Sequence, residues 1–237
     1  MSQKKPATVS DGVPTARTRS EMLIDPKSVS KSRCVCIFPD AKEADSYRVL
    51  REQIQQRTGE KGWNTLMITS ARPGEGKTLT AINLALTFAK SVDGSALLID
   101  ADLKQQSIHR YLGISGKTGL IDHLLDACPF EDIMIQPGIE RLKIISGGRT
   151  IHDSSEILGS QRMKRLVTEM KARYDDRYIF FDVPAILGRA DALALAPLVD
   201  GILVVVEAGR TSVHDIRKAL DLIPKEKFLG FVLNRLT

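Results

Sequence analysis

The segment from Leu66 to Thr78 constrains the fold of this chain more than any other part of its sequence. A short apolar run is followed by a turn rich in Pro and Gly that ends in Gly-Lys-Thr, and a helical pattern then runs from Leu79 to Ala89. The glycines allow the loop backbone to curl so that its N–H groups point inward at phosphate oxygens. The start of the helix adds partial positive charge at the same place. The segment therefore predicts a phosphate-binding loop, and with it a chain that binds a nucleoside triphosphate.

Two side chains of this loop carry chemistry of their own. Lys77 places a positive charge at the β- and γ-phosphates, and the hydroxyl of Thr78 is a ligand for Mg²⁺. Ala71 departs from the pattern G-x-x-x-x-G-K-[ST], whose first position is glycine. The residues expected to bind the nucleotide are Pro73, Gly74, Glu75, Gly76, Lys77, Thr78 and Leu79.

The composition fits one α/β domain with additional segments. The chain has 237 residues, of which 43% are hydrophobic. No apolar stretch approaches the roughly 20 residues that a membrane span needs, and the polar, lysine-rich N-terminus lacks the apolar segment of a secretory signal. Cys34, Cys36 and Cys128 form no C-x-x-C pair, so a disulfide framework is not expected and a reducing cytoplasm is favoured. Cys34 and Cys36 are expected on alternate faces of a short extended segment, Cys34–Phe38.

The net charge of +5 is concentrated near the N-terminus. Residues 1–33 hold seven Lys or Arg and three Asp or Glu, a net charge of +4, so the remainder carries only +1. The segment 1–40 lacks hydrophobic periodicity, which predicts a disordered basic tail before a domain over 41–237. Such a tail is most often a solubilising extension, although it also suits an anionic membrane surface. The body of the chain shows neither a recognition helix nor basic residues interleaved with aromatic ones, so nucleic acid is not an expected partner.

Short apolar runs alternate with helical patterns along the rest of the chain. Strands are expected at 65–69, 96–100, 142–146, 178–182, 201–207 and 228–233. Helices are expected at 41–56, 78–90, 118–127, 160–173, 191–198 and 212–222, with short helices over 103–140. Several strands are almost wholly apolar, as in Ile202–Val206, which indicates parallel strands buried on both faces. The pattern predicts an α/β fold with a doubly wound, mainly parallel sheet whose ligand lies at the carboxyl ends of the strands.

Acidic residues follow two of these strands. The apolar run 97–99 leads into Asp100 and Asp102, and the run 179–181 leads into Asp182. Mg²⁺ prefers oxygen ligands and retains several waters, so one or two carboxylates together with phosphate oxygens are enough to hold it. Aspartates at strand ends also cap helices. Aspartates that follow two strands after one phosphate loop nevertheless favour a metal-assisted site.

Three stretches resemble the Walker A, A′ and B motifs of the bacterial tyrosine kinases of capsule and exopolysaccharide synthesis. They are Thr69–Thr78, Leu98–Lys104 and Phe180–Pro184. Residues 45–51 look like the oligomerisation motif Glu-x-x-Arg-x-x-Arg of that family, and Val232–Arg235 is similar to the end of a last strand whose Asn contacts adenine. These kinases are P-loop proteins with deviant Walker motifs, related to the septum-site and plasmid-partition ATPases. They transfer the γ-phosphoryl group of ATP to tyrosine.

The resemblance covers about residues 40–237 and implies ATP and Mg²⁺ as cofactors. In that family, catalysis is positioning together with charge neutralisation on the transferring phosphoryl group. The resemblance implies that Lys77 binds the phosphates and that Thr78, Asp102 and Asp182 bind Mg²⁺. It also implies that Asp100 accepts the proton of the tyrosine hydroxyl and that Asn234 contacts adenine.

The same resemblance implies partners and a location. These kinases act with a membrane-anchored chain-length regulator on tyrosine-containing proteins, so the chain is expected to be cytoplasmic and peripheral at the inner face of the plasma membrane. A homo-oligomer is expected through Asp45, Arg48 and Arg51, which share one helix face. The family's tyrosine-rich segment is not found after the last expected strand. The principal acceptor is therefore expected on another protein, with weak self-phosphorylation.

The chain departs from the family pattern at several positions, and two other interpretations stay open. Asp45 stands for Glu, Lys104 for the usual Arg, and Ala185 for a second Pro. A partition-type ATPase switch, which hydrolyses ATP without phosphorylating protein, is the main alternative. That class carries a second lysine early in the loop, where this chain has Arg72, and a solvated Arg72 is favoured over one that reaches a partner's nucleotide. The third interpretation, a non-catalytic adaptor, is disfavoured because every residue that carries the chemistry is retained.

Overall fold

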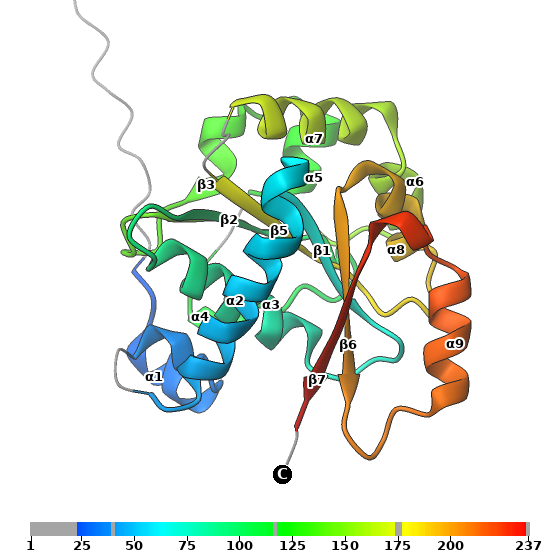
Figure 1. The fold of residues 1–237 in the computed structure, drawn as a ribbon. Coiled ribbons are helices and arrows are strands. Elements are labelled where there is room, and N and C mark those ends of the chain that lie inside the picture. The colour runs from blue at the N-terminus through cyan, green and yellow to red at the C-terminus, as the bar shows by residue number, and fades with distance from the viewer. Residues whose placement is uncertain (1–22, 39–40, 116–117, 174–176, 236–237) are drawn as a thin grey trace, which may run out of the picture.

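The computed structural model describes residues 23–38, 41–115, 118–173 and 177–235. Its centre is a seven-stranded sheet in the order β3-β4-β2-β5-β1-β6-β7 (Figure 1). Neighbouring strands are parallel except for β3 and β4, so the predicted doubly wound, mainly parallel sheet is confirmed. The strands are β1 (Thr65–Ser70), β2 (Ser95–Asp100), β3 (Met134–Ile135), β4 (Leu142–Ile145), β5 (Arg177–Asp182), β6 (Gly201–Glu207) and β7 (Phe228–Asn234).

Helices cover both faces of the sheet (Figure 1). The first face is covered by α1 (Pro26–Lys31), α2 (Ala44–Thr58), α3 (Lys77–Ala89) and α4 (Ile108–Leu112). The second face is covered by α5 (Leu120–Asp126), α6 (Ser154–Leu158), α7 (Gln161–Arg173), α8 (Asp191–Leu195) and α9 (Val213–Asp221). Among the described residues, every helix is too short or too polar to cross a lipid bilayer.

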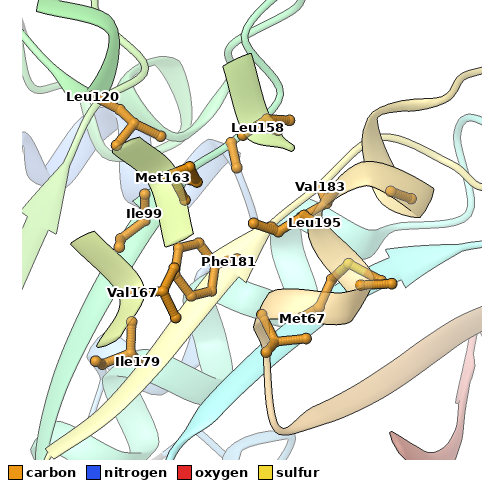
Figure 2. Packing of buried hydrophobic residues seen from close by; sticks show 14 of the residues in the cluster. Met67, Ile99, Leu120, Leu158, Met163, Val167, Ile179, Phe181, Val183 and Leu195 are labelled. Atoms are coloured by element: carbon orange, nitrogen blue, oxygen red, sulfur yellow. The ribbon is translucent and has the colours of Figure 1, made fainter. Parts of the chain in front are cut away.

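Each face of the sheet contributes to its own hydrophobic core, because successive side chains of a strand point to opposite faces. Met67 and Phe181 pack under α7 and α8, as Figure 2 shows. Their neighbours Leu66 and Phe180 pack on the opposite face, against α2 and α3. All residues of β1 and β2 are buried, which agrees with the unbroken apolar runs in the sequence.

The expected elements are found with small shifts at their ends. The strand at 201–207 matches its expected bounds, and the other five expected strands differ by one residue at one end. The helix expected at 41–56 begins at Ala44, and the one expected at 191–198 divides into α8 and a 3₁₀ turn over Ala196–Leu198. The short antiparallel strand β3 was not expected, since only two residues pair and such a length shows no alternation.

The extended segment expected at Cys34–Phe38 is wrong, because Val35–Ile37 form a 3₁₀ helix. The reason is a contact from α3. Asn83 accepts a hydrogen bond from the Cys36 N–H group at 3.0 Å and donates to the Arg33 carbonyl at 3.3 Å. A distant asparagine thus sets the backbone of this segment.

The helix α1 lies within the segment expected to be a disordered tail. The Asp25 carboxylate caps it by accepting the N–H groups of Lys27 and Ser28, each at 3.1 Å, and Val29 is fully buried. Residues 1–22 lie outside the described residues, and the expected disorder of the tail stays a prediction there.

Candidate functional site

The phosphate loop connects β1 to α3 at the carboxyl edge of the sheet. Gly74 and Gly76 have φ values of 87° and 94°, a left-handed conformation that favours glycine. A Cβ on Gly76 would lie 2.1 Å from Asn234 Nδ2, so the end of the last strand packs directly against this turn. Ala71 is fully buried and does not have a positive φ, which explains why the first position of the loop accepts alanine.

Oxygen atoms surround the Lys77 ammonium group. Its Nζ lies 3.3 Å from Thr78 Oγ1, 3.4 Å from Asp182 Oδ1 and 3.5 Å from Asp102 Oδ2. The carboxylates meet because β2 and β5 are neighbours whose last residues, Asp100 and Asp182, pair in register. The structure therefore brings Lys77, Thr78, Asp102 and Asp182 together, as the strand ends predict.

Burial is the main influence on the charges of this cluster. It disfavours the charged form of Lys77, but the carboxylates of Asp182, Asp102 and Asp100 outweigh it and raise the pKa of that lysine. Burial also raises the pKa of Asp182, against the opposing charge of Lys77. Asp182 Oδ2 is buried and has no hydrogen-bond partner among the described residues. An unsatisfied carboxylate oxygen is costly in a buried site, and a hard cation is a ligand that satisfies it.

The described residues contain no group of three or more His, Cys, Asp or Glu side chains that could hold a metal alone. Mg²⁺ does not need such a group, because it binds through one or two carboxylates, waters and substrate phosphates. The Asp182 carboxylate and the Thr78 hydroxyl therefore fit a magnesium ion that arrives with a nucleotide.

Asp100 uses both of its oxygens in hydrogen bonds to backbone N–H groups. Oδ1 accepts from Asp102 at 3.2 Å, and Oδ2 accepts from Ser107 and Ile108 at 2.9 and 3.1 Å. The side chain is fully buried, and burial, followed by the charge of Asp182, raises its pKa to about 7. Asp100 thus holds the loop that carries Asp102. Its expected contact with a tyrosine hydroxyl stays a prediction.

Arg189 is a residue of this site that sequence analysis missed. It lies between β5 and α8, and its Nη1 donates to Asp102 Oδ1 at 2.9 Å. Asp102 therefore contacts Arg189 with one oxygen and Lys77 with the other. The signal in the sequence is a lone charge in the otherwise uncharged segment 183–190.

Glu75 connects the phosphate loop to two later elements. Its side chain is buried, with Oε2 accepting from the Arg72 N–H group at 2.9 Å and Oε1 accepting from the Thr211 hydroxyl. The Glu75 carbonyl accepts from Asn234 Nδ2 at 2.9 Å. Glu75 and Asn234 therefore shape the loop, and the expected contact of Asn234 with adenine stays a prediction.

Arg72 is solvated, as expected, with 60% of its side chain exposed, but it also forms an ion pair within the chain. Its Nε and Nη2 donate to the two carboxylate oxygens of Asp215 at 2.7 and 2.9 Å. Hydrogen bonds from Arg72, and then from Ser212, lower the pKa of Asp215 to about 2. The start of α9 in the same chain thus binds the arginine.

A cavity of about 1270 Å³ opens at this edge of the sheet. Besides the phosphate loop, the segments 104–111 and 184–189 contribute to its wall, as does Arg235 after β7. Leu79 packs instead against the core beneath α2 and α3. The predicted site residues that line the cavity are Pro73, Gly74, Gly76, Lys77, Thr78 and Asp102.

Comparison with known proteins points to one family. A family model described as an AAA domain matches residues 64–227. The chain is 34% identical over 198 residues to the tyrosine-protein kinase YwqD of Bacillus subtilis, a match that covers 83% of this chain and 82% of YwqD. It is 32% identical over 209 residues to the succinoglycan biosynthesis transport protein ExoP of Rhizobium meliloti, with 86% of this chain and 26% of ExoP covered.

Solved structures agree with this comparison. The kinase domain of the Escherichia coli tyrosine kinase ETK is similar with a TM-score of 0.77 and 25% identity, over 96% of this chain and 86% of that domain. The septum site-determining protein MinD of Pyrococcus horikoshii, complexed with Mg-ADP, shares the fold with a TM-score of 0.60 and 23% identity, over 73% of this chain and 70% of MinD. The convergence of a phosphate loop with strand-end carboxylates, and the similarity to YwqD over most of both chains, lead to the same conclusion. The chain belongs to the bacterial tyrosine-protein kinases of capsule and exopolysaccharide biosynthesis.

Proposed function

We propose that this chain transfers the γ-phosphoryl group of Mg-ATP to a tyrosine hydroxyl on another protein. The observation that carries the proposal is the state of Asp182. Its Oδ2 is buried without a hydrogen-bond partner among the described residues, while its Oδ1 lies 3.4 Å from Lys77 Nζ. This arrangement suits a carboxylate that binds a magnesium ion beside the lysine of a phosphate loop.

Each residue of the cluster has a place in this reaction. Mg²⁺, held by Asp182 and Thr78, supplies neutralisation of the phosphate charge when it is bound. Lys77 keeps its own charge at neutral pH, since its pKa is raised. The tyrosine oxygen forms a bond to the γ-phosphorus while the bond from that phosphorus to the oxygen of ADP breaks. Both oxygens of Asp100 accept backbone N–H groups, so we assign the proton of the hydroxyl to Asp102, which lines the cavity, in place of the expected Asp100. Asp100 then positions the loop that carries Asp102.

Packing of the chain's own tyrosines supports an acceptor on another protein. The hydroxyl of Tyr178 lies 2.7 Å from that of Thr58, and the Tyr47 ring packs against the core beneath α2. Tyr174 lies outside the described residues. Tyr111 lines the cavity and is the position to examine for self-phosphorylation.

A membrane-anchored chain-length regulator is the proposed partner, and the inner face of the plasma membrane is the proposed location. The similarity to ExoP, whose name assigns it to succinoglycan biosynthesis and transport, supports both proposals. A homo-oligomer is proposed as well, with α2 at its interface.

Labelled ATP tests the proposal directly. The purified full chain is incubated with Mg²⁺ and γ-labelled ATP, with and without the cytoplasmic end of the regulator, and phosphotyrosine is quantified beside an Asp182→Asn variant. We expect labelled tyrosine on the added partner and none with the variant. Release of phosphate without phosphotyrosine in either arm would make the chain an ATPase switch, and nucleotide binding without turnover would make it an adaptor.

A further inference from the structure

The cavity extends to both sides of the phosphate loop. The loop follows β1, in the middle of the sheet, while Arg235 follows β7 and the segment 104–111 follows β2. β7 and β2 each lie two strands from β1, on opposite sides. Strands are about 4.8 Å apart, so each end of the cavity is roughly 10 Å from the loop across the sheet. The adenine contact predicted for Asn234 would put the nucleotide on the β7 side, which leaves the β2 side for the acceptor.

Positive charge without a carboxylate partner gathers on the β2 side. Lys104, His109 and Arg110 line the cavity there, and Lys104 and Arg110 are exposed. Arg110 Nη2 donates to the Gln106 carbonyl at 3.1 Å. Within the described part of the chain, neither Lys104 nor Arg110 forms an ion pair with Asp or Glu. Burial, followed by the charge of Arg110, lowers the pKa of His109, whose imidazole can hydrogen-bond to a carboxylate.

The other cations of the cavity already have carboxylate partners. Arg189 contacts Asp102 at 2.9 Å, Arg235 contacts Glu207 at 2.7 Å, and Lys77 lies between two carboxylates. Asp102 is the one acidic side chain among the described lining residues, and it contacts two cations. The positive charge of the cavity that has no carboxylate partner among the described residues therefore lies on the β2 side, away from the proposed nucleotide site.

We propose that Lys104, His109 and Arg110, here called the basic rim, bind acidic residues that flank the acceptor tyrosine. The proposal rests on the kinase function proposed above and adds the substrate class, an acidic tyrosine-containing segment. The rim residues line the same cavity as Asp102, and Lys104 and Arg110 are exposed, so a carboxylate bound to the rim holds the neighbouring tyrosine at the cavity that contains Asp102. Exposed ion pairs of this kind contribute modestly and are screened by salt.

Three peptides of equal length test the basic rim, each with one tyrosine flanked by Glu, by Gln or by Lys. The full chain phosphorylates them with Mg-ATP at low ionic strength, and kcat/KM is measured for each. We expect the Glu-flanked peptide to exceed the Lys-flanked one by on the order of tenfold, with the ratio falling as salt is added. The ratio compares the kcat/KM values of two peptides with the same enzyme, so an effect of a substitution on the nucleotide site changes both values equally and cancels.

A double variant, Lys104→Glu with Arg110→Glu, is expected to reverse this ratio. The matched control is Arg217→Glu with Lys218→Glu, which makes the same change in net charge on exposed residues of α9, outside the cavity wall. The control is expected to keep the preference of the unmodified chain. Loss of the preference in both variants would assign it to net charge and overturn the proposal.

A binding arm separates failure of the rim from failure of the kinase function. The fluorescently labelled Glu- and Lys-flanked peptides are titrated with the full chain in the presence of Mg²⁺ and ADP. Tighter binding of the Glu peptide, reversed by the rim variant, supports the rim even where no peptide is phosphorylated. Absence of phosphorylation together with this binding would contradict only the kinase proposal. Equal binding of both peptides overturns the rim. Rim-dependent sedimentation with phosphatidylserine vesicles, together with equal peptide binding, would assign the surface to a membrane instead.

Discussion

Lys77 retains its charge inside a buried cluster because carboxylates lie close to it on the ends of two strands. Lys77→Met removes that charge, and Asp182→Asn weakens the ligand proposed for the ion. Each substitution is expected to slow phosphoryl transfer by about 10²-fold or more, since electrostatic positioning dominates this reaction. Initial rates with purified variants measure the effect, with the exposed Lys218→Met as the control. Near-normal turnover in either site variant would show that the active site lies elsewhere.

Arg189 allows a second prediction at this scale. Its hydrogen bond to Asp102 fixes one oxygen of a carboxylate that also contacts Lys77. In Arg189→Ala, we expect kcat to fall by about tenfold and the KM for ATP to change much less, as for an interaction that matters mainly in the transition state. Arg189→Lys is expected to recover part of the loss. An unchanged kcat in Arg189→Ala would mean that the bond does not orient Asp102 for the reaction.

The site residues that sequence could predict are those fixed by local pattern. Lys77 and Thr78 belong to a loop with a fixed spacing, and Asp102 and Asp182 follow apolar strands whose ends must meet in a parallel sheet. The contacts of Arg189 and Asp215 could not be predicted in this way. Arg189 bonds to a residue 87 positions earlier, and Asp215 to one 143 positions earlier. No local periodicity reports contacts over such separations.

Secondary structure elements show the same division. The central strands were predictable because burial on both faces leaves unbroken apolar runs. The 3₁₀ helix at Val35–Ile37 was not, because a side chain of α3 decides the backbone there. The helix α1 depends on a cap from Asp25 within an otherwise polar segment, which composition alone assigns to a tail.

The junction between α9 and the phosphate loop gives a prediction on pH. The pKa of Asp215 is lowered to about 2, mainly by its hydrogen bond from Arg72. A carboxyl group whose pKa is lower in the folded state than in the unfolded state stabilises the folded state at pH values above the unfolded pKa of about 3.9. This stabilisation is lost as the pH falls through the folded pKa. We expect the difference in free energy of unfolding between the unmodified chain and Asp215→Asn to be constant from about pH 7 to pH 5 and to shrink below about pH 4.

Urea unfolding at several pH values measures this difference. Asp221→Asn, at the exposed end of the same helix, serves as the control and is expected to show a smaller effect. A difference for Asp215→Asn that does not depend on pH would contradict the assignment of its stabilising effect to the charged pair.

Oligomerisation of the molecule is predicted to depend on α2, and the two arginines predicted at the interface make different contacts in the structure. Arg48 pairs with Asp45 on an exposed face, whereas Arg51 donates to the Thr87 carbonyl of α3 at 3.3 Å. Arg48→Ala is therefore the cleaner test of a subunit interface, and Arg51→Ala is expected also to lower stability within one subunit. We expect Arg48→Ala to shift the mass in light scattering toward the monomer. A mass equal to that of the unmodified chain would leave α2 as a solvated face.

The position of β1 between β5 and β6 has a consequence for how the molecule comes into being. Thr65 pairs with Ile179, and Gly76 packs against Asn234. The strand β1 and the phosphate loop therefore contact residues that are translated more than 100 positions after them. Such long-range pairing is slow to form. A nascent chain therefore cannot shape its phosphate loop fully until the final strand is translated. We therefore expect a nascent chain to bind ATP only after β7 has been translated, at whatever point in synthesis that occurs.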